Sequence, residues 1–203
     1  HQAASGVNAL GTFWNNNIIG TSAAGKGGYF NNSNLQHNNI IGTCAGYCAS
    51  GFYNNFFGLC AGFFTSGSEN IVIGSCSGLC NTSGSRNLYL GCRSGGNITT
   101  GNDNIIFGCL ASKVGLTSDT SNVIIMSTGG YAQLRLMWCP GNSSNNIYLG
   151  AKAGTYTTNG SNNIALGVCA GACTQSSNDN IFMGVLTGAC SCSASNNIFM
   201  GNR

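Results

Sequence analysis

The chain has 203 residues, of which only 5% are charged: seven Lys and Arg stand against four Asp and Glu. So few ionisable side chains argue against acid–base enzymes, and a formal net charge of +3 is too small to form a nucleic-acid-binding surface. Apolar residues reach 42%, unlike a charged disordered tail, and no apolar run approaches the roughly 18 residues of a membrane-spanning helix.

One short block recurs from end to end: Asn, three mainly apolar residues and Gly. Residues 1–14 hold only a degenerate copy, at 8–11, and are expected to form an irregular first coil. Early copies read Asn-Asn-apolar-apolar-Gly, and later copies place three apolar residues between Asn and Gly. In chain order the copies close at Gly20, Gly42, Gly58, Gly74, Gly91, Gly108, Met126, Gly150, Gly167, Gly184 and Gly201.

The copies follow one another at steps of 16 to 18 residues, apart from steps of 22 to Gly42 and 24 to Gly150. Their β-branched and aromatic triplets are typical of strands and too short for helices. Short strands at this period, with Gly-rich corners, predict a parallel β-solenoid. We therefore expect one all-β domain over 1–203, with about eleven coils that rise roughly 50 Å at about 4.8 Å each.

Two segments interrupt the period. Residues 25–36 fall within the 22-residue step, and an irregular insertion over 127–144 falls within the 24-residue step. Insertions in solenoids map to loops on one face. The segment that leads to Trp138 carries alternating Leu134 and Leu136, which favours an extra strand or a packing flap over a simple bulge.

Stacked coils place equivalent residues in columns, so the motif Asn residues are expected to form a hydrogen-bonded amide ladder. The simpler alternative is that Asn and Gly only supply turn conformations, and the two are compatible. The predicted ladder consists of Asn70, Asn87, Asn104, Asn122, Asn146, Asn163, Asn180 and Asn197.

The repeats over 146–154 (NIYLGAKAG) and 163–171 (NIALGVCAG) resemble the Asn-x-x-Ile-Gly-x-x-Ala-Gly repeats of trimeric autotransporter adhesin heads. They are also similar to repeats of phage and giant-virus fibre proteins. The resemblance extends from about Asn15 to Arg203. It implies a parallel β-roll, often trimeric, that serves as an extracellular stalk or adhesin.

Twelve cysteines in a chain of this length indicate an oxidising compartment and disulfide staples. Metal binding is disfavoured because there is no C-x2-C pair and only two His, so we expect no metal and no cofactor. Cys92 and Cys109 are predicted to pair between coils. For the i, i+4 pairs that begin at Cys44, Cys76 and Cys169, bridges within a coil are preferred, and links between coils such as Cys60–Cys76 compete. The candidates are Cys44, Cys48, Cys60, Cys76, Cys80, Cys92, Cys109, Cys139, Cys169, Cys173, Cys190 and Cys192.

Five Asn-x-Ser/Thr sequons lie in the polar stretches between coils, where a glycan could project into solvent. Chance is the alternative, because a chain rich in Asn and Ser forms sequons readily. The predicted N-glycosylation sites are Asn31, Asn81, Asn97, Asn142 and Asn159.

The apolar triplets predict a lateral interface, because alternate residues of a strand face opposite ways and all three are apolar. If the outer two residues fill the coil, the middle ones form an exposed stripe. With the opposite parity, the outer residues form a wider one. The middle residues chosen as interface candidates are Val72, Tyr89, Ile106, Ile124, Tyr148, Phe182 and Phe199.

The resulting hypothesis is a structural subunit of an extracellular, virion or cell-surface fibre that assembles with itself laterally and end to end. The alternative is an adhesin or carbohydrate-binding fibre head, with glycans or a cell surface as partners. An ice-binding solenoid is a remote alternative, since Thr forms no column. We expect no catalytic residues, no nucleic-acid partner and no membrane span.

Overall fold

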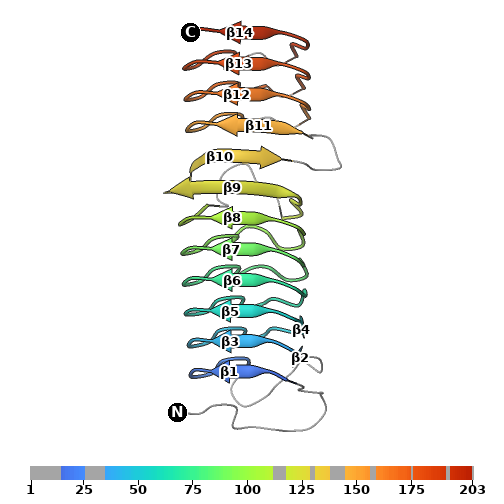
Figure 1. The fold of residues 1–203 in the computed structure, drawn as a ribbon, viewed down its shortest axis with the longest axis vertical. Coiled ribbons are helices and arrows are strands. Elements are labelled where there is room, and N and C mark those ends of the chain that lie inside the picture. The colour runs from blue at the N-terminus through green and yellow to red at the C-terminus, as the bar shows by residue number, and fades with distance from the viewer. Residues whose placement is uncertain are drawn as a thin grey trace.

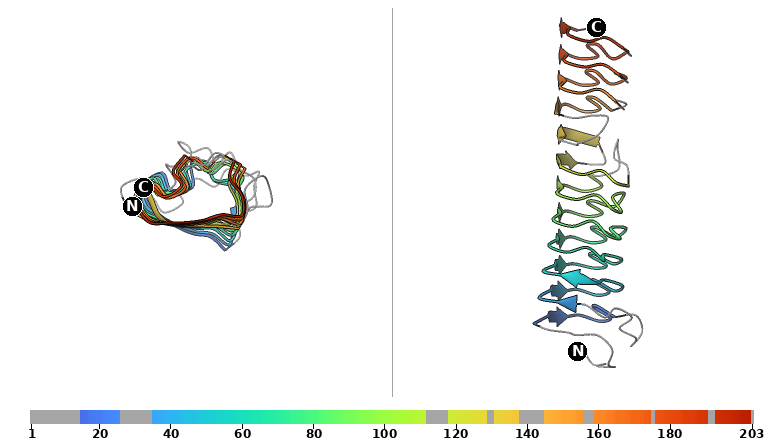
Figure 2. Two further views of the ribbon diagram at one scale, coloured as in Figure 1. Left: turned by 90° about the horizontal axis from the view of Figure 1, so that it is seen from above. Right: turned by 90° about the vertical axis from the view of Figure 1, so that its right-hand side faces the viewer.

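The computed structural model shows an all-β solenoid, as the repeat predicted, whose strands stack into one long column (Figure 1). Viewed along the axis, the coils superimpose on one another (Figure 2). The structure describes residues 15–25, 35–111, 118–128, 131–137, 145–155, 159–174, 176–190 and 193–202. Within these ranges the chain contains no helix.

Most strands contain only the three residues before the motif Gly. Their bounds are β1 Asn17–Ile19, β2 Leu35–Gln36, β3 Asn39–Ile41, β4 Gly51–Phe52, β5 Asn55–Phe57, β6 Ile71–Ile73, β7 Leu88–Leu90, β8 Ile105–Phe107, β9 Val123–Thr128, β10 Tyr131–Met137, β11 Asn146–Leu149, β12 Ile164–Leu166, β13 Ile181–Met183 and β14 Ile198–Met200.

Twelve strands form one sheet in the order β1-β3-β5-β6-β7-β8-β9-β10-β11-β12-β13-β14, and β2 pairs with β4 in a separate two-stranded sheet. Apart from β10, neighbours in the long sheet are parallel and in register from coil to coil, so that Ile71 pairs with Leu88, which pairs with Ile105. The number of coils stays a prediction, because residues 1–14 and parts of both interruptions lie outside the described ranges.

The second interruption supplies an extra strand. Within the predicted insertion over 127–144, residues 131–137 form β10, which lies between β9 and β11 and runs antiparallel to both. Leu134 pairs with Met126 on one side and with Leu149 on the other, so the reversed strand keeps the columns of the sheet aligned. The predicted strand is therefore present, and its insertion explains the 24-residue step.

The core is a file of middle strand residues that point into the coil. Ile40, Phe56, Val72, Tyr89 and Phe182 are each 0% exposed. Among the described side chains, the file runs up to Ile125 before β10 and continues from Tyr148 after it. A small buried residue three positions after the motif Gly, usually Ala or Ser, faces this file and keeps each coil thin.

Tyr89 carries a buried hydroxyl group that has no hydrogen-bond partner among the described residues. The nearby Asn104 amide cannot donate to it, because its Nδ2 already donates to Asn87 Oδ1 at 2.9 Å and to the Thr120 carbonyl at 2.8 Å. Burial raises the pKa of the Tyr89 phenol above its usual value, so the group stays protonated at neutral pH.

Tyr89→Phe should therefore leave the free energy of unfolding unchanged or raise it by up to about 1 kcal/mol, since it removes a buried polar group that lacks a partner. Urea unfolding monitored by circular dichroism measures the change. Thr65→Val is the companion variant, because the Thr65 hydroxyl is also buried and the described part of the chain offers it no hydrogen bond. Destabilisation of more than 1 kcal/mol by Tyr89→Phe would contradict this view of the hydroxyl.

Candidate interaction surface

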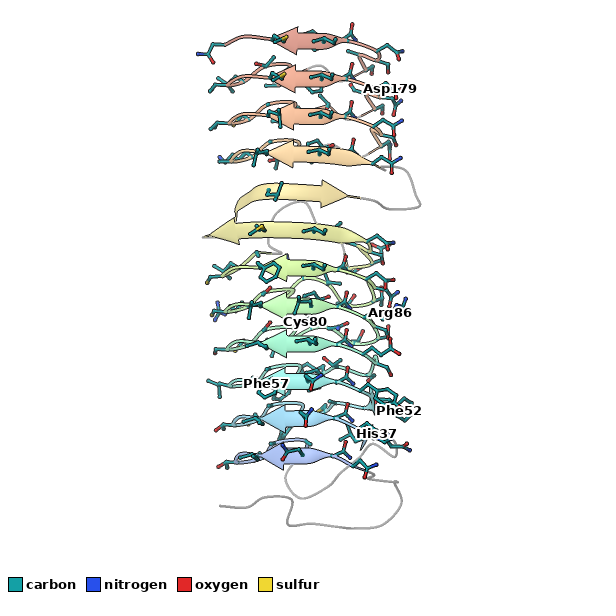
Figure 3. All side chains as sticks on the ribbon, viewed as in Figure 1. His37, Phe52, Phe57, Cys80, Arg86 and Asp179 are labelled. Atoms are coloured by element: carbon teal, nitrogen blue, oxygen red, sulfur yellow. The ribbon has the colours of Figure 1, made fainter. Side chains whose placement is uncertain are left out.

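The outward side of the long sheet is an apolar face that runs through all its strands. In each short strand the first and third residues point away from the coil and are exposed or half-buried. Ile71 and Ile73 are 41% and 37% exposed, and Leu149 is 49% exposed. Phe57 lies on this face (Figure 3). We call these residues the apolar face: Ile19, Ile41, Phe57, Ile71, Ile73, Leu88, Leu90, Ile105, Phe107, Ile124, Met126, Leu134, Ile147, Leu149, Ile164, Leu166, Ile181, Met183, Ile198 and Met200.

The predicted interface residues were taken from the wrong side of the strand. Val72, Tyr89, Ile106, Tyr148 and Phe182 are buried in the core rather than exposed. Phe199 is half-buried, and among the seven candidates only Ile124 lies on the apolar face. The cause is the motif Asn: its side chain points inward, so the residue two positions later must also point inward.

The early repeats contained a signal that could have settled this parity. Asn17, Asn39 and Asn55 occupy the first strand position, which is Ile or Leu in later coils. A polar residue at that position favours the outward direction. Asn39 Nδ2 donates to Asn55 Oδ1 at 2.7 Å on the exposed side of the sheet.

The motif Asn side chains form a buried ladder along the coils. The backbone N–H and Nδ2 of Asn87 donate to Asn70 Oδ1 at 3.0 and 3.1 Å, and Nδ2 also donates to the Gly101 carbonyl at 3.0 Å. Its Oδ1 accepts from the backbone N–H and Nδ2 of Asn104 at 3.0 and 2.9 Å. Each ladder Asn is therefore hydrogen-bonded to the coil before it and to the coil after it, and it also bonds a backbone carbonyl at a corner.

The membership of the ladder differs from the prediction at two places. Asn122 is not a rung: its φ is 57°, and the neighbouring Val123 takes the ladder position, with its N–H donating to Asn104 Oδ1 at 3.2 Å. The step from Asn104 to Val123 is 19 residues, against 16 or 17 between successive rungs from Asn38 to Asn104, so the motif Asn falls one position before the rung. The ladder also begins earlier than predicted, with Asn16, Asn38 and Asn54 as rungs.

A second polar ladder, which the repeat motif did not reveal, lies two residues before the Asn rungs. The backbone N–H of Ser68 donates to Ser85 Oγ at 3.0 Å, and that of Ser85 donates to Asn102 Oδ1 at 2.8 Å. Here the side chain of each coil accepts from the preceding coil, in the direction opposite to the Asn ladder. At each corner, one backbone N–H group therefore donates to a side chain of the preceding coil, and another donates to a side chain of the following coil.

The residue just before each Asn rung lies in the left-handed backbone region and forms an exposed ridge beside the sheet. Arg86 and Asp179 lie along this edge (Figure 3). Arg86 binds Asp103 through Nε–Oδ1 and Nη2–Oδ2 contacts of 2.6 and 2.9 Å, and its hydrogen bonds hold the pKa of the Asp103 carboxyl below its usual value. An ionised, paired carboxylate is poorly suited to act as a general acid at neutral pH.

The described cysteines form no disulfide with one another, so the predicted staples are not present in this structure. Cys139 and Cys192 lie outside the described residues. Burial and the neighbouring Cys44 and Cys76 thiols raise the pKa of the Cys60 thiol, and burial and the Cys109 thiol raise the pKa of Cys92. Thiols of successive coils therefore lie near one another, an arrangement that favours pairs between coils over the preferred pairs within a coil.

The predicted glycosylation sites differ in their accessibility. Asn97 and Asn159 are exposed and stay predicted sites. The prediction for Asn81 is corrected, because its side chain is 0% exposed. Its Oδ1 accepts from the Gly84 N–H at 2.9 Å, and its Nδ2 donates to the Gly84 carbonyl. A glycan on Asn81 would require this corner to open. Asn31 and Asn142 lie outside the described residues.

The described part of the chain brings together no group of three or more His, Cys, Asp or Glu side chains that could hold a metal ion. The same residues include no helix long and apolar enough to span a membrane. The apolar face is therefore the most extensive candidate site that the described residues present.

Comparison with known proteins leaves the chain without a family assignment: no family model, no curated protein sequence and no solved structure matches it.

Proposed function

We propose that the protein is a structural subunit of an extracellular, virion or cell-surface fibre, and that its apolar face packs against a second copy of the chain. The observation that carries this proposal is the continuity of the face. It runs through the twelve described strands of one sheet, including the reversed β10. Its polar members are the Asn residues in the first outward position of β1, β3 and β5.

The dimensions of the face support a second copy as its occupant. Twelve strands at about 4.8 Å give a length of about 55 Å, and two outward columns with their side chains are about 10 Å wide. Two such faces would bury on the order of 1,100 Å² in total, which exceeds the roughly 1,000 Å² needed for a biological interface and fits a reversible association. The described side chains of the face carry no charge, so two copies can pack without burying an unpaired ion.

End-to-end addition is the second part of the proposed assembly. β1 and β14 are the outer strands of the long sheet, and each has one neighbour in it. The open edge of a strand offers backbone groups to a further strand, and the aligned coils would let another solenoid continue the same columns. The density of cysteines and the exposed sequons at Asn97 and Asn159 support the proposed extracellular location.

The lateral contact is tested by the double variant Leu149→Glu with Met183→Glu. Both side chains point outward, so the substitutions spare the core, while two carboxylates would have to be buried in the interface. We expect the wild type to associate reversibly in sedimentation equilibrium under reducing conditions, and the variant to remain monomeric at tenfold or higher concentration.

The matched control is Phe64→Glu with Leu186→Glu, which places two carboxylates on exposed apolar side chains outside the strands. Other coils carry Asn97 and Arg93 at the equivalent positions, so a polar side chain is compatible with both sites. The control should associate like the wild type. A wild type that stays monomeric at millimolar concentration, or a control that dissociates equally, would contradict packing through the apolar face.

An adhesin remains the second candidate, because aromatic rings gather on neighbouring coils. Tyr47 stacks on Phe63 with ring centroids 4.8 Å apart, and Phe63 contacts the exposed Phe64 edge to face at 4.6 Å. Partly exposed aromatic rings offer apolar surfaces on which a sugar ring can pack. A discrete monomer that binds glycans would favour this alternative over the fibre subunit.

A further inference from the structure

Five cysteines follow one corner of the solenoid through five successive coils. Cys44, Cys60 and Cys76 each stand two positions after the motif Gly, and Cys92 and Cys109 stand one position after it in the next two coils. We call these five residues the thiol row. It is independent of the apolar face and of the proposed fibre function.

The backbone repeats closely along the first three members of the row. The N–H of Cys60 donates to the Thr43 carbonyl at 2.9 Å, and that of Cys76 donates to the Leu59 carbonyl at 2.8 Å. The φ angles of Cys44, Cys60 and Cys76 are 54°, 52° and 54°. The three side chains therefore leave equivalent backbone positions on stacked coils.

This geometry limits which thiols can form a bond. Equivalent Cα atoms of neighbouring coils are about 4.8 Å apart, within the disulfide range of roughly 4.4–6.8 Å. Cys44 and Cys76 are two coils apart, at about 9.6 Å, which is too far for a disulfide. Cys60 stands on the coil between them, so it can pair with either neighbour but with only one at a time.

The remaining two thiols make a natural pair. Cys92 and Cys109 stand at the same position of adjacent coils, where the N–H of Leu110 donates to the Cys92 carbonyl at 2.9 Å. Cys76 stands in the coil before Cys92, one position further from its motif Gly. The row thus holds five thiols on five successive coils, and an odd number cannot be paired completely.

We propose that the thiol row forms two disulfides between coils, one of them through Cys60, and leaves one thiol as the attachment point for a further disulfide. A low-molecular-weight disulfide such as oxidised glutathione supplies the oxidation. For each bond formed, two thiols lose two electrons and two protons, and one small disulfide is reduced to two thiols.

The unpaired position can move along the row without further oxidation. With Cys44–Cys60 bonded, the Cys76 thiolate attacks the Cys60 sulfur, the bond to Cys44 breaks, and Cys44 leaves as a thiolate that takes up a proton. The Cys60–Cys76 bond replaces the Cys44–Cys60 bond, with no net redox change. The remaining thiol can attack an external disulfide in the same way, which would link the solenoid to another molecule.

Serine variants test the pairing after equilibration in a glutathione redox buffer. The protein is alkylated after unfolding without reduction, and labelling of the five positions is measured by peptide mass spectrometry. Wild type should show about one labelled or glutathione-bound thiol summed over the row. Cys44→Ser and Cys76→Ser should each show none, because the four remaining thiols form two pairs.

Cys60→Ser is the decisive variant. It has the same number of thiols as the two other variants, but Cys44 then has no neighbour in the row and Cys76, Cys92 and Cys109 form an odd group. It should therefore show two labelled or glutathione-bound thiols where the others show none. Circular dichroism of each oxidised variant verifies that the solenoid is retained.

Two outcomes would overturn the proposal. Cross-linked peptides that join Cys44 to Cys48 and Cys76 to Cys80, with Cys60 labelled in the wild type, would show pairing within coils. Equal labelling of the three serine variants would show that Cys60 is not the shared partner.

Discussion

Replacement of Asn54 by Leu is expected to lower the free energy of unfolding by about 4 kcal/mol. Leu has a similar size, but it removes the Oδ1 atom that accepts from the N–H and Nδ2 of Asn70, at 2.9 and 3.1 Å, and the Nδ2 donor to the Gly67 carbonyl. Three buried polar groups lose a partner, and each unsatisfied group costs about 1–3 kcal/mol. Urea unfolding of the reduced protein, monitored by circular dichroism, measures the loss.

The adjacent residue provides the control. Asn55→Leu makes the same chemical change one position along the chain, where the side chain points out of the coil and later repeats carry Ile or Leu. Its loss should be below about 1 kcal/mol, because the affected hydrogen bond from Asn39 is exposed to water. Equal destabilisation by the two variants would show that the buried ladder does not hold the coils.

The second large effect is expected at the glycine that ends each strand. Gly91 has a φ of +130°, and a Cβ atom built on it would lie 2.6 Å from the carbonyl oxygen of Gly108 in the next coil. Gly91→Ala should therefore destabilise the protein by at least about 3 kcal/mol, from backbone strain and from separation of the two coils. Thermal and urea unfolding report the change.

Gly96→Ala is the matched comparison within the same coil. Its nearest neighbour would be the Arg93 carbonyl oxygen at 3.2 Å, with the next contact at 4.0 Å, and Gly96 is not among the glycines with positive φ. The expected change is within about 1 kcal/mol in either direction, because the added methyl group also reduces the freedom of the unfolded chain. A mild effect of Gly91→Ala would mean that adjacent coils can separate at little cost.

The period and the residue types predicted the architecture because both are local properties. Triplets such as 71–73 and 88–90 are too short for helices, and their regular spacing requires a stack of equivalent coils. The column of Asn follows from the same repetition, but not the direction in which it faces. A strand within the second interruption was predictable from the alternation of Leu134 and Leu136, whereas its antiparallel direction depends on the pairing of β9 and β11.

The sequence by itself determined the solenoid and its columns, and the tertiary structure decided which way each column faces. Three consecutive apolar residues look the same from either side, so Val72 and Ile73 cannot be assigned to core or surface from their triplet alone. Hydrogen bonds between coils bury the Asn rungs and thereby fix the parity of every strand. The same contacts place Val123, and not Asn122, next to Asn104 in the Asn ladder. The register between these coils is set by their pairing and not by the local motif.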